Sequence, residues 1–494
     1  MNEWLSVGVV ALVGLLSVVF PVLRMFFKVP IEYNEGWNVY NAARITHHVT
    51  LYGQQYSWTP VIYPPLSFFV IAWLHRLGFD YLTAGRILSL SSLLACCVLV
   101  GLVILRLSRN RRAAIFASFF CLTVFCSAAP EYTGMDDPQI FAQTFFLGGL
   151  LTYISGPPGL ERLAATALLF IVGGNIKHNL LEFPLAVLLD LCFVSRKKVA
   201  EYVVVSSLLL GTSIAVSMSV AGPYFISNIL LPRTYSLKHA VAHFFGSGFD
   251  PLQIPLLVVA VWSVQAFRNT RFRIAVIFFW SSLLVGFAFG GGTGVSVNAY
   301  FGLYLSLSVM IGLFLHWFWE VGPFGFTGKW DLAGKLVVPL VLLLSLAPSW
   351  LSSAGAAWFR TRSSDFHLSG IQALPLVQER FLQEVSFLRS RQGPAICESL
   401  LHCYEAGKSY EFSPFDSFML VSSGRLSERP IIERLQKHEF AAVQLNEPIA
   451  LYLEGYSERF SPEFAAATFD HYQLAFEERG CYIYVPRAVL RLAQ

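Results

Sequence analysis

Long apolar runs with few charged residues recur along the first three quarters of the chain, and they constrain the fold more than any other feature. A helix needs about 20 apolar residues to cross the hydrocarbon core of a bilayer. We place such runs at about 4–27, 86–105, 113–130, 138–155, 162–176, 180–195, 203–221, 253–267, 274–290, 297–318 and 336–352. The sequence therefore predicts a polytopic α-helical membrane protein with about 11 transmembrane helices.

The composition agrees with a chain whose solvent is largely lipid. Hydrophobic residues make up 55% of the 494 residues, charged residues 13%, and the mean hydropathy is +0.57. A soluble chain carries about 25% charged residues. The net charge of +4 is spread over short loops and gives no support to nucleic-acid binding, so the expected partners include membrane lipids and no nucleic acid. The first run is too long for the apolar part of a signal peptide, and we expect it to be a membrane helix.

Basic residues gather in three of the loops between these runs, and they predict the orientation. The clusters are Arg106, Arg109, Arg111 and Arg112; Arg196, Lys197 and Lys198; and Arg268, Arg271 and Arg273. Loops rich in Lys and Arg stay in the cytoplasm. With 11 helices, the N-terminus then lies in the cytoplasm and the C-terminus outside, in a multi-pass protein of the inner (plasma) membrane.

Charge density rises sharply after the last apolar run. Strand-like segments at 394–398, 440–445 and 482–485 alternate with helical patterns such as 431–437. This alternation predicts a small α/β domain. We therefore divide the chain into a transmembrane module, 1–352, and an extracytoplasmic α/β domain, 353–494.

The tail holds three of the eight cysteines, namely Cys397, Cys403 and Cys481. An odd number allows at most one disulfide within the domain, and pairing of Cys397 with Cys403 is one option that the sequence leaves open. No spacing typical of a zinc site occurs. The acids Glu398 and Asp416 read as ordinary surface residues.

An acidic motif follows the first apolar run. Asn34 is a good N-cap, which places Glu35 in the first turn of a helix, where the helix dipole favours a carboxylate. Glu35 then either completes the helix start or acts as a general base at the membrane surface. A second acid, Glu32, and the aromatic residues Trp37, Tyr40, Tyr52, Tyr56 and Trp58 share this loop, as in a sugar-binding subsite.

Three further segments of the predicted outer side carry polar chemistry. Tyr63-Pro64-Pro65 forms a rigid junction between a loop and a helix. Arg86 begins the second run at the outer interface, where it either binds a phosphate or snorkels. Asp137 before Pro138 is a helix N-cap, which leaves Asp136 as a spare acid facing the same compartment as Glu35.

Basic residues also occur on this side. Lys177 and His178 separate two apolar runs, either as a polar turn or as part of a functional cavity, since such charges are costly beside lipid. Arg233, Lys238 and His239 form a basic stretch suited to a phosphate. The glycine-rich segment 290–294 precedes Asn298 and Tyr300, which begin the next helix.

Taken in order, these motifs resemble the GT-C glycosyltransferases, which include protein O-mannosyltransferases and the bacterial aminoarabinose and lipid-mannose transferases. The resemblance rests on the first acidic motif, the Tyr63 junction, Arg86, the Asp136-Asp137 pair, the Lys177 turn and the C-terminal domain. The family often has Asp-Glu in the first loop, whereas this chain has Asn34-Glu35, so Glu35 is the matching acid.

The resemblance implies an enzyme that takes a sugar from a polyprenyl-phosphate carrier at the outer face. The sugar passes, with inversion, to a lipid, glycan or protein acceptor. Glu35 would be the general base, and Asp136 would orient the acceptor or assist the base, with Asp137 beside it as a further catalytic residue. The residues implied for the donor phosphate are Lys177, Arg86, His178, Arg233, Lys238 and His239. Those implied for the sugar or acceptor are Trp37, Tyr40, Tyr63, Asn298 and Tyr300. We expect no metal or other cofactor, although the ligand set leaves a divalent ion open.

Two other functions fit a chain of this kind. A lipid or glycan flippase or transporter also has many spans, but here the ionisable residues lie in outer loops, and Asp190 is the main acid within a run. A non-catalytic cell-envelope assembly protein would bind through its outer domain and would not need Glu35.

Overall fold

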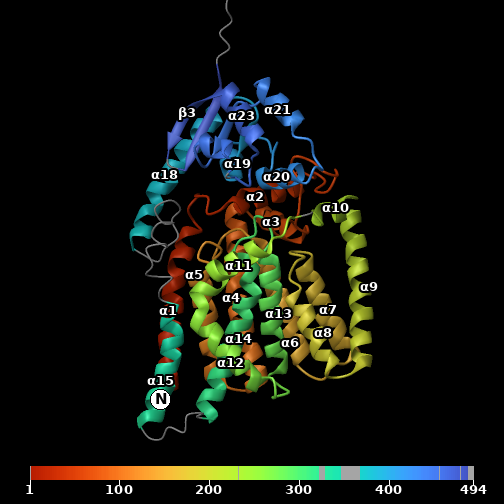
Figure 1. Cartoon of the computed structure of the whole chain (residues 1–494), viewed down its shortest axis with the longest axis vertical. Coiled ribbons are helices and arrows are strands. Elements are labelled where there is room, and N and C mark those ends of the chain that lie inside the picture. The colour runs from red at the N-terminus through yellow and green to blue at the C-terminus, as the bar shows by residue number, and fades with distance from the viewer. Residues whose placement is uncertain are drawn as a thin grey trace, which may run out of the picture.

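The structure is a computed structural model that describes residues 2–231, 233–321, 329–346, 368–455, 457–478 and 480–487. Helices dominate it, and a small sheet lies near the C-terminus (Figure 1). The predicted boundary between the two parts of the chain, at residues 352 and 353, lies outside the described residues.

Each predicted apolar run overlaps a helix. The helices are α1 (Asn2–Arg24), α4 (Tyr81–Ser108), α5 (Arg111–Ala128), α6 (Pro138–Ile154), α7 (Leu160–Gly174), α8 (Glu182–Cys192), α9 (Arg196–Ala221), α12 (Gln253–Ala266), α13 (Arg273–Gly290), α14 (Phe301–Val321) and α15 (Lys329–Leu344). Among the described residues, six helices are long and apolar enough to cross a membrane, namely α1, α4, α5, α9, α13 and α14 with the turn before it. The helical, multi-pass prediction is confirmed, and the number of 11 spans stays a prediction.

The helices form a bundle around α14, which is almost entirely enclosed, whereas α9 lies on the flank with little of its surface buried (Figure 1). A helix that is apolar on all sides and exposed in this way needs lipid as its solvent. Local signals set the helix starts. Asp80 and Asn110 accept hydrogen bonds from the first turns of α4 and α5, and Asp137 caps α6 with Pro138 at its first position.

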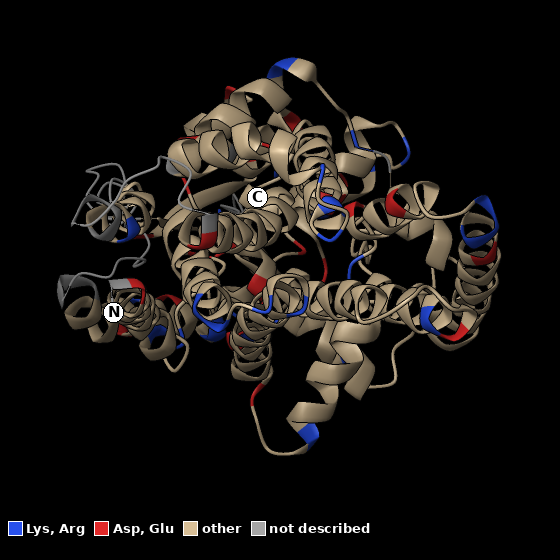
Figure 2. Ribbon diagram, turned by 90° about the horizontal axis from the view of Figure 1, so that it is seen from below, with Lys and Arg blue, Asp and Glu red and all other residues tan. Residues whose placement is uncertain are grey.

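The predicted basic loops lie near one another at the end of the bundle that holds the N-terminus. Arg112 at the start of α5 forms an ion pair with Glu3 of α1. Arg273 at the start of α13 pairs with Asp190 near the end of α8 at 2.8 Å. Figure 2 views the molecule from this end and shows Lys and Arg at the ends of several helices. This is the arrangement that the predicted orientation requires.

Short helices cover the opposite end of the bundle, beneath the C-terminal region (Figure 1). They are α2 (Tyr33–Thr46), α3 (Leu66–Arg76), α10 (Phe225–Ile229) and α11 (Leu237–His243). The prediction that Asn34 caps α2 is wrong. Glu32 is the N-cap instead, because its backbone is extended and its carboxylate accepts a hydrogen bond from the N–H of Asn34 at 2.8 Å. Glu35 remains in the first turn, as predicted.

The C-terminal region contains a four-stranded sheet in the order β1-β2-β4-β3. The strands are β1 (Ala395–Cys397), β2 (Ala442–Leu445), β3 (Tyr472–Glu478) and β4 (Cys481–Pro486). The helices around them are α18 (Leu368–Ser390), α19 (Leu400–Glu405), α20 (Pro414–Ser422), α21 (Arg429–Gln436), α22 (Ile449–Leu453) and α23 (Pro462–His471). The three predicted strands are confirmed. β3 was not predicted, because this edge strand is largely exposed and its polar residues hide any apolar alternation.

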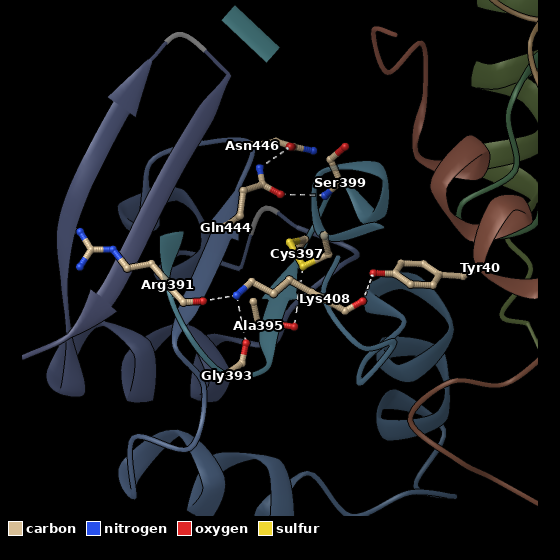
Figure 3. The surroundings of a disulfide bond; sticks show 10 residues. Tyr40, Arg391, Gly393, Ala395, Cys397, Ser399, Lys408, Gln444 and Asn446 are labelled. Atoms are coloured by element: carbon tan, nitrogen blue, oxygen red, sulfur yellow. Dashed lines mark hydrogen bonds between the residues drawn. A yellow bond between two sulfur atoms is a disulfide. The ribbon is translucent and has the colours of Figure 1, made fainter. Parts of the chain in front are cut away.

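A disulfide joins Cys397 to Cys403, whose Cα atoms are 5.8 Å apart, and it closes the turn between β1 and α19 (Figure 3). Cys481 is the remaining thiol of the tail and is buried. Close to the disulfide, Lys408 donates to the carbonyl of Gly393 at 3.0 Å, while its own carbonyl accepts from the Tyr40 hydroxyl at 2.9 Å. Tyr40 belongs to α2, so this bond ties the C-terminal region to the bundle.

The C-terminal region and the short helices share one hydrophobic core. That cluster combines Trp37 and Phe68 of α2 and α3 with Phe381 and Leu400 of α18 and α19. The closest approach is at Gly36, where an added Cβ atom would lie 2.2 Å from the backbone nitrogen of Leu401. Only glycine allows α2 and α19 to come this close.

We expect Gly36→Ala to destabilise the protein by about 3 kcal/mol, because the new methyl group overlaps backbone atoms that cannot rotate away. Thermal unfolding of the detergent-purified protein measures the effect as a lower melting temperature. Gly211→Ala in α9 is the control, since nothing lies within 4 Å of its added Cβ. Equal melting temperatures for the Gly36→Ala variant and the wild type would contradict the described packing of α19 on α2.

Candidate active site

A cavity of about 550 Å³ lies where the ends of the bundle helices meet the C-terminal region. Its size is typical of sites that enclose small molecules. The polar residues that line it are Glu32, Asn34, Gln139, Lys177, His178, Asn179, Ser296, Arg233, Asn298, Asp416 and Arg459. The aromatic residues are Tyr33, Trp37, Tyr63, Tyr132, Tyr235, Phe289 and Phe415. Predicted site residues Trp37, Tyr63, Lys177, His178, Arg233 and Asn298 are thus brought together in one cavity.

Lys177 supplies a buried positive charge to this cavity. Its side chain is 3% exposed, and Nζ lies 3.4 Å from the centroid of the Tyr63 ring. Burial lowers the pKa of Lys177 to about 8, helped by the charge of Arg233 and opposed by that of Asp137. In the part of the chain that the structure describes, no carboxylate lies within ion-pair distance of this ammonium group. A buried cation without an anionic partner is suited to an anionic ligand.

Two further basic residues accompany Lys177. The guanidinium of Arg233 lies 5.5 Å from the ring centroid of Phe415, within the range of a cation–π contact. His178 lines the cavity and has an exposed side chain. Desolvation by the surrounding protein and the charges of Lys177 and Arg233 lower its pKa to about 4. His178 is therefore neutral near pH 7 and acts there as a hydrogen-bonding group.

Asp416, in the first turn of α20, is the most enclosed acid on the cavity wall. It is 1% exposed, so the prediction of a surface acid is wrong. The start of α20 packs against α2 and the segment after it, where Phe415 donates to the Tyr33 hydroxyl and Ser417 to the carbonyl of Trp58. Oδ2 of Asp416 accepts a hydrogen bond from Ser413 at 2.7 Å, and its Oδ1 makes none of normal geometry with the described residues. Burial raises the pKa of Asp416 to about 6, although Ser413, Arg233 and the nearby Trp37 favour the carboxylate. Glu398, the other acid read as a surface residue, is also buried.

Glu32 is the second acid of the cavity. One oxygen accepts the N–H of Asn34, and the other lies 3.8 Å from Nη2 of Arg459. Arg459 also covers the rings of Tyr33 and Phe415, at 4.1 and 5.1 Å from their centroids. The sequence gives no signal for Arg459, because its contact with Glu32 depends on how the C-terminal region packs on α2.

Glu35, the predicted general base, is not among the residues that line the cavity. Its side chain is 0% exposed and forms an ion pair with Arg86, with 2.7 Å between Nε and Oε1 and 2.7 Å between Nη2 and Oε2. The N–H groups of Ile31 (2.8 Å) and Asp136 (3.2 Å) also donate to this carboxylate. All of these partners belong to the protein itself, so no acceptor hydroxyl reaches Glu35 in this arrangement.

Arg86, near the start of α4, pairs with Glu35 inside the protein. Its side chain is 0% exposed, which excludes snorkelling, and it does not line the cavity. Besides Glu35 it donates to the carbonyls of Phe27 at 2.7 Å and Val29 at 2.6 Å. A buried guanidinium is tolerated only with such complete pairing.

Asp136 and Asp137 are also buried and lie outside the cavity lining. Asp137 caps α6 through a 2.8 Å hydrogen bond from the N–H of Gln139, as predicted. The backbone of Asp136 bonds to Glu35 and, at 2.6 Å, to the Asn38 side chain. Burial, together with the neighbouring charges of Glu35 and Asp137, raises the pKa of Asp136 well above its usual value. Asp136 is therefore a buried acid beside the ion pair, outside the cavity lining.

The other predicted residues lie away from the cavity lining. Lys238 and His239 are exposed. Tyr40 stacks on Tyr410 with ring centroids 4.6 Å apart and helps to attach the C-terminal region. The hydroxyl of Tyr300 contacts Nδ1 of His243 at 3.4 Å.

Comparison with known proteins identifies the fold of the chain. No family model and no curated protein matches the sequence. ArnT from Cupriavidus metallidurans, an aminoarabinose transferase, is similar in structure when bound to undecaprenyl phosphate, with a TM-score of 0.54 and 13% identity over 99% of both chains. The apo form of the same protein has a TM-score of 0.55 and 13% identity, over 98% of this chain and 97% of that chain. The Archaeoglobus fulgidus oligosaccharyltransferase tethered with an acceptor peptide has a TM-score of 0.52 and 11% identity, over 98% of this chain and 74% of that chain.

The chain has the GT-C fold. The resemblance drawn from the sequence motifs is confirmed at this level. Within the GT-C fold, the Glu35–Arg86 pair holds the segment after α1 against α4, and the cavity opens beside it.

We expect Arg86→Met and Glu35→Gln each to destabilise the protein by about 3–5 kcal/mol, because each leaves a buried group without its partner. The double variant should recover part of this loss, since it removes both charges. Thermal unfolding of the purified proteins checks the prediction, with Arg425→Met, which alters an exposed arginine, as control. Additive losses in the double variant would contradict the coupling.

Proposed function

We propose that the protein is an inverting glycosyltransferase of the GT-C type. It moves a sugar from a polyprenyl-phosphate-linked donor to a lipid, glycan or protein acceptor at the outer face of the membrane. The observation that carries the proposal is one cavity that combines three side chains: Lys177, which is buried and has no carboxylate partner among the described residues, the neighbouring Arg233 and the buried acid Asp416. The GT-C fold supports the same reaction class.

The basic residues serve the donor phosphate. As the bond between the sugar and the phosphate breaks, negative charge grows on the departing phosphate oxygen, and positive groups placed there stabilise the transition state. Lys177 and Arg233 supply this charge, and His178 can donate a hydrogen bond. The aromatic faces of Tyr63 and Trp37 border the space for the sugar. Because the side chains supply the charge, the proposed mechanism uses no metal.

Asp416 is the proposed general base. Its carboxylate takes the proton of the acceptor hydroxyl, whose oxygen attacks the anomeric carbon, while the phosphate leaves from the opposite face with the electron pair of the broken bond. A base works best with a pKa near the working pH, and Asp416 has a pKa of about 6 and an oxygen without a normal hydrogen bond. Glu32 has both oxygens engaged, and we assign it to holding Arg459 and the start of α2.

We assign Glu35 to positioning, in place of the base role inferred from the sequence. Its four contacts fix the start of α2, the part of the chain from which Glu32, Asn34 and Trp37 reach the cavity. Asp136 takes part in the same network and has no contact with the cavity.

The proposal includes the predicted topology. The N-terminus and the basic loops lie in the cytoplasm, and residues 353–494 form an extracytoplasmic domain that closes the cavity. Two observations support it. The basic loops and the C-terminal sheet lie at opposite ends of the bundle (Figure 1), and the sheet region contains a disulfide, which persists in oxidising compartments.

Transfer of radiolabelled sugar from polyprenyl phosphate by the purified protein, in membrane extract as the source of acceptor, tests the function. We expect Asp416→Asn to lower kcat by about 10²–10⁴-fold, because the base is lost. Lys177→Gln should lower kcat/KM by about 10²–10³-fold through lost charge stabilisation. Lys238→Gln, at an exposed lysine outside the cavity, should leave kcat and kcat/KM unchanged. If neither the wild type nor any variant transfers sugar from any donor, and the protein moves lipid across vesicles instead, a flippase function is favoured.

The pH profile of kcat/KM tests the roles of the two side chains. Asp416 must be ionised, so the rate should rise with pH through about 6, and Lys177 must be protonated, so it should fall as pH rises through about 8. The acidic limb should disappear in Asp416→Asn, and Lys177→Arg should move the alkaline limb to higher pH. An acidic limb that persists in active Asp416→Asn would assign the base to another residue.

A further inference from the structure

Three side chains with metal-binding atoms meet inside the C-terminal region, apart from the cavity. Glu384 comes from α18, His402 from α19 and Cys481 from the first position of β4. One ligand atom from each residue lies within 4.8 Å of the other two, and all three residues are buried. Oε2 of Glu384 and Nε2 of His402 are 2.7 Å apart. In the part of the chain that the structure describes, no other such group of three occurs.

We propose that Glu384, His402 and Cys481 form a zinc site. A carboxylate oxygen, an imidazole nitrogen and a thiolate sulfur are the three kinds of protein ligand that zinc takes, usually with tetrahedral geometry. The thiolate disfavours Mg²⁺ and Ca²⁺, which take oxygen ligands. Ligand atoms at about 2 Å from a tetrahedral zinc ion are separated by about 3.3 Å. The 2.7 Å contact between Glu384 and His402 therefore has to widen by about 0.6 Å, while the wider separations close.

Two further observations concern the imidazole of His402. Nδ1 of His402 is buried and has no hydrogen-bond partner among the described residues. Buried polar atoms are normally paired, so a buried histidine with one ring nitrogen on Glu384 and the other unsatisfied is unusual for a purely structural residue. In addition, the ring of Phe381 packs edge-on against that of His402, with centroids 4.8 Å apart, which holds the imidazole in one orientation.

Cys481 is the third ligand of the proposed site. The other two cysteines of the region are joined in a disulfide, and Cys481 is left as a free, buried thiol beside a glutamate and a histidine. A free cysteine alone would be an ordinary small apolar residue. Together with two further ligands from separate elements, it makes a site that holds α18, α19 and β4 together.

The consequence of zinc binding would be structural. α19 carries His402, and the same helix packs against Gly36 of α2 at backbone contact distance. A metal that fixes α19 would stiffen the support of α2 and thereby the cavity wall. This proposal does not depend on the glycosyltransferase function, and its test needs no substrate.

The first test is the metal content of the full-length protein, purified without a polyhistidine tag, loaded with zinc and passed through a desalting column. We expect about one zinc ion per chain to be retained in the wild type. Cys481→Ser and His402→Gln should lose it. Cys192→Ser and His48→Gln, which alter an exposed thiol and an exposed histidine, should retain it. Wild type without zinc, or zinc retained in both site variants, would overturn the proposal.

Cobalt supplies a readout that does not depend on the folding of the variants. Co²⁺ in the site of the wild type should show tetrahedral d–d absorption together with a thiolate-to-cobalt charge-transfer band. The charge-transfer band should persist in Cys192→Ser. A cobalt spectrum of the wild type without the thiolate band would overturn the site. Zinc should also raise the melting temperature of the wild type, and it should leave that of Cys481→Ser unchanged.

Discussion

The arrangement of the whole outer end depends on one buried ion pair, between Glu35 and Arg86. The pair joins Glu35 of α2 to Arg86 of α4. It also binds backbone groups of two further segments, the connection after α1 and the loop before α6. Two charges removed from water are stable only when every donor and acceptor is satisfied. Here the protein satisfies both, and the position of α2 is fixed as a result.

The position of α2 in turn decides what the cavity contains. Glu32, Asn34 and Trp37 reach the cavity from the first turns of α2. The C-terminal region adds Asp416 and Arg459, and it lies close enough because Gly36 has no side chain. Cations and carboxylates therefore share an enclosed space in which charges act more strongly than in water. Such a space suits a reaction that moves a proton and builds charge on a phosphate.

Much of the fold follows from local sequence. Each apolar run overlaps a helix, and turn and cap residues such as Asp137-Pro138 begin helices where expected. The strand β3 was not predicted, because an exposed edge strand lacks an apolar pattern. The pairing of Cys397 with Cys403 was one option among others, and the structure selects it.

The site was less predictable, because it depends on contacts between residues that lie far apart in the sequence. Lys177 could be found, because a lysine between two apolar runs is costly without a function. The sequence does not reveal which of Glu32 and Glu35 faces the cavity, since Glu35 turns away to meet Arg86, 51 residues later. Asp416 looks like a surface acid until the C-terminal region is packed against the bundle.

The most direct test of the account is a cryo-electron microscopy structure of the protein with undecaprenyl phosphate. The account predicts that the phosphate lies in the cavity, within hydrogen-bond reach of Lys177 and Arg233, on the side of the bundle that carries the C-terminal sheet. A phosphate bound elsewhere, for example at the basic loops of the opposite end, with the cavity unoccupied, would contradict it.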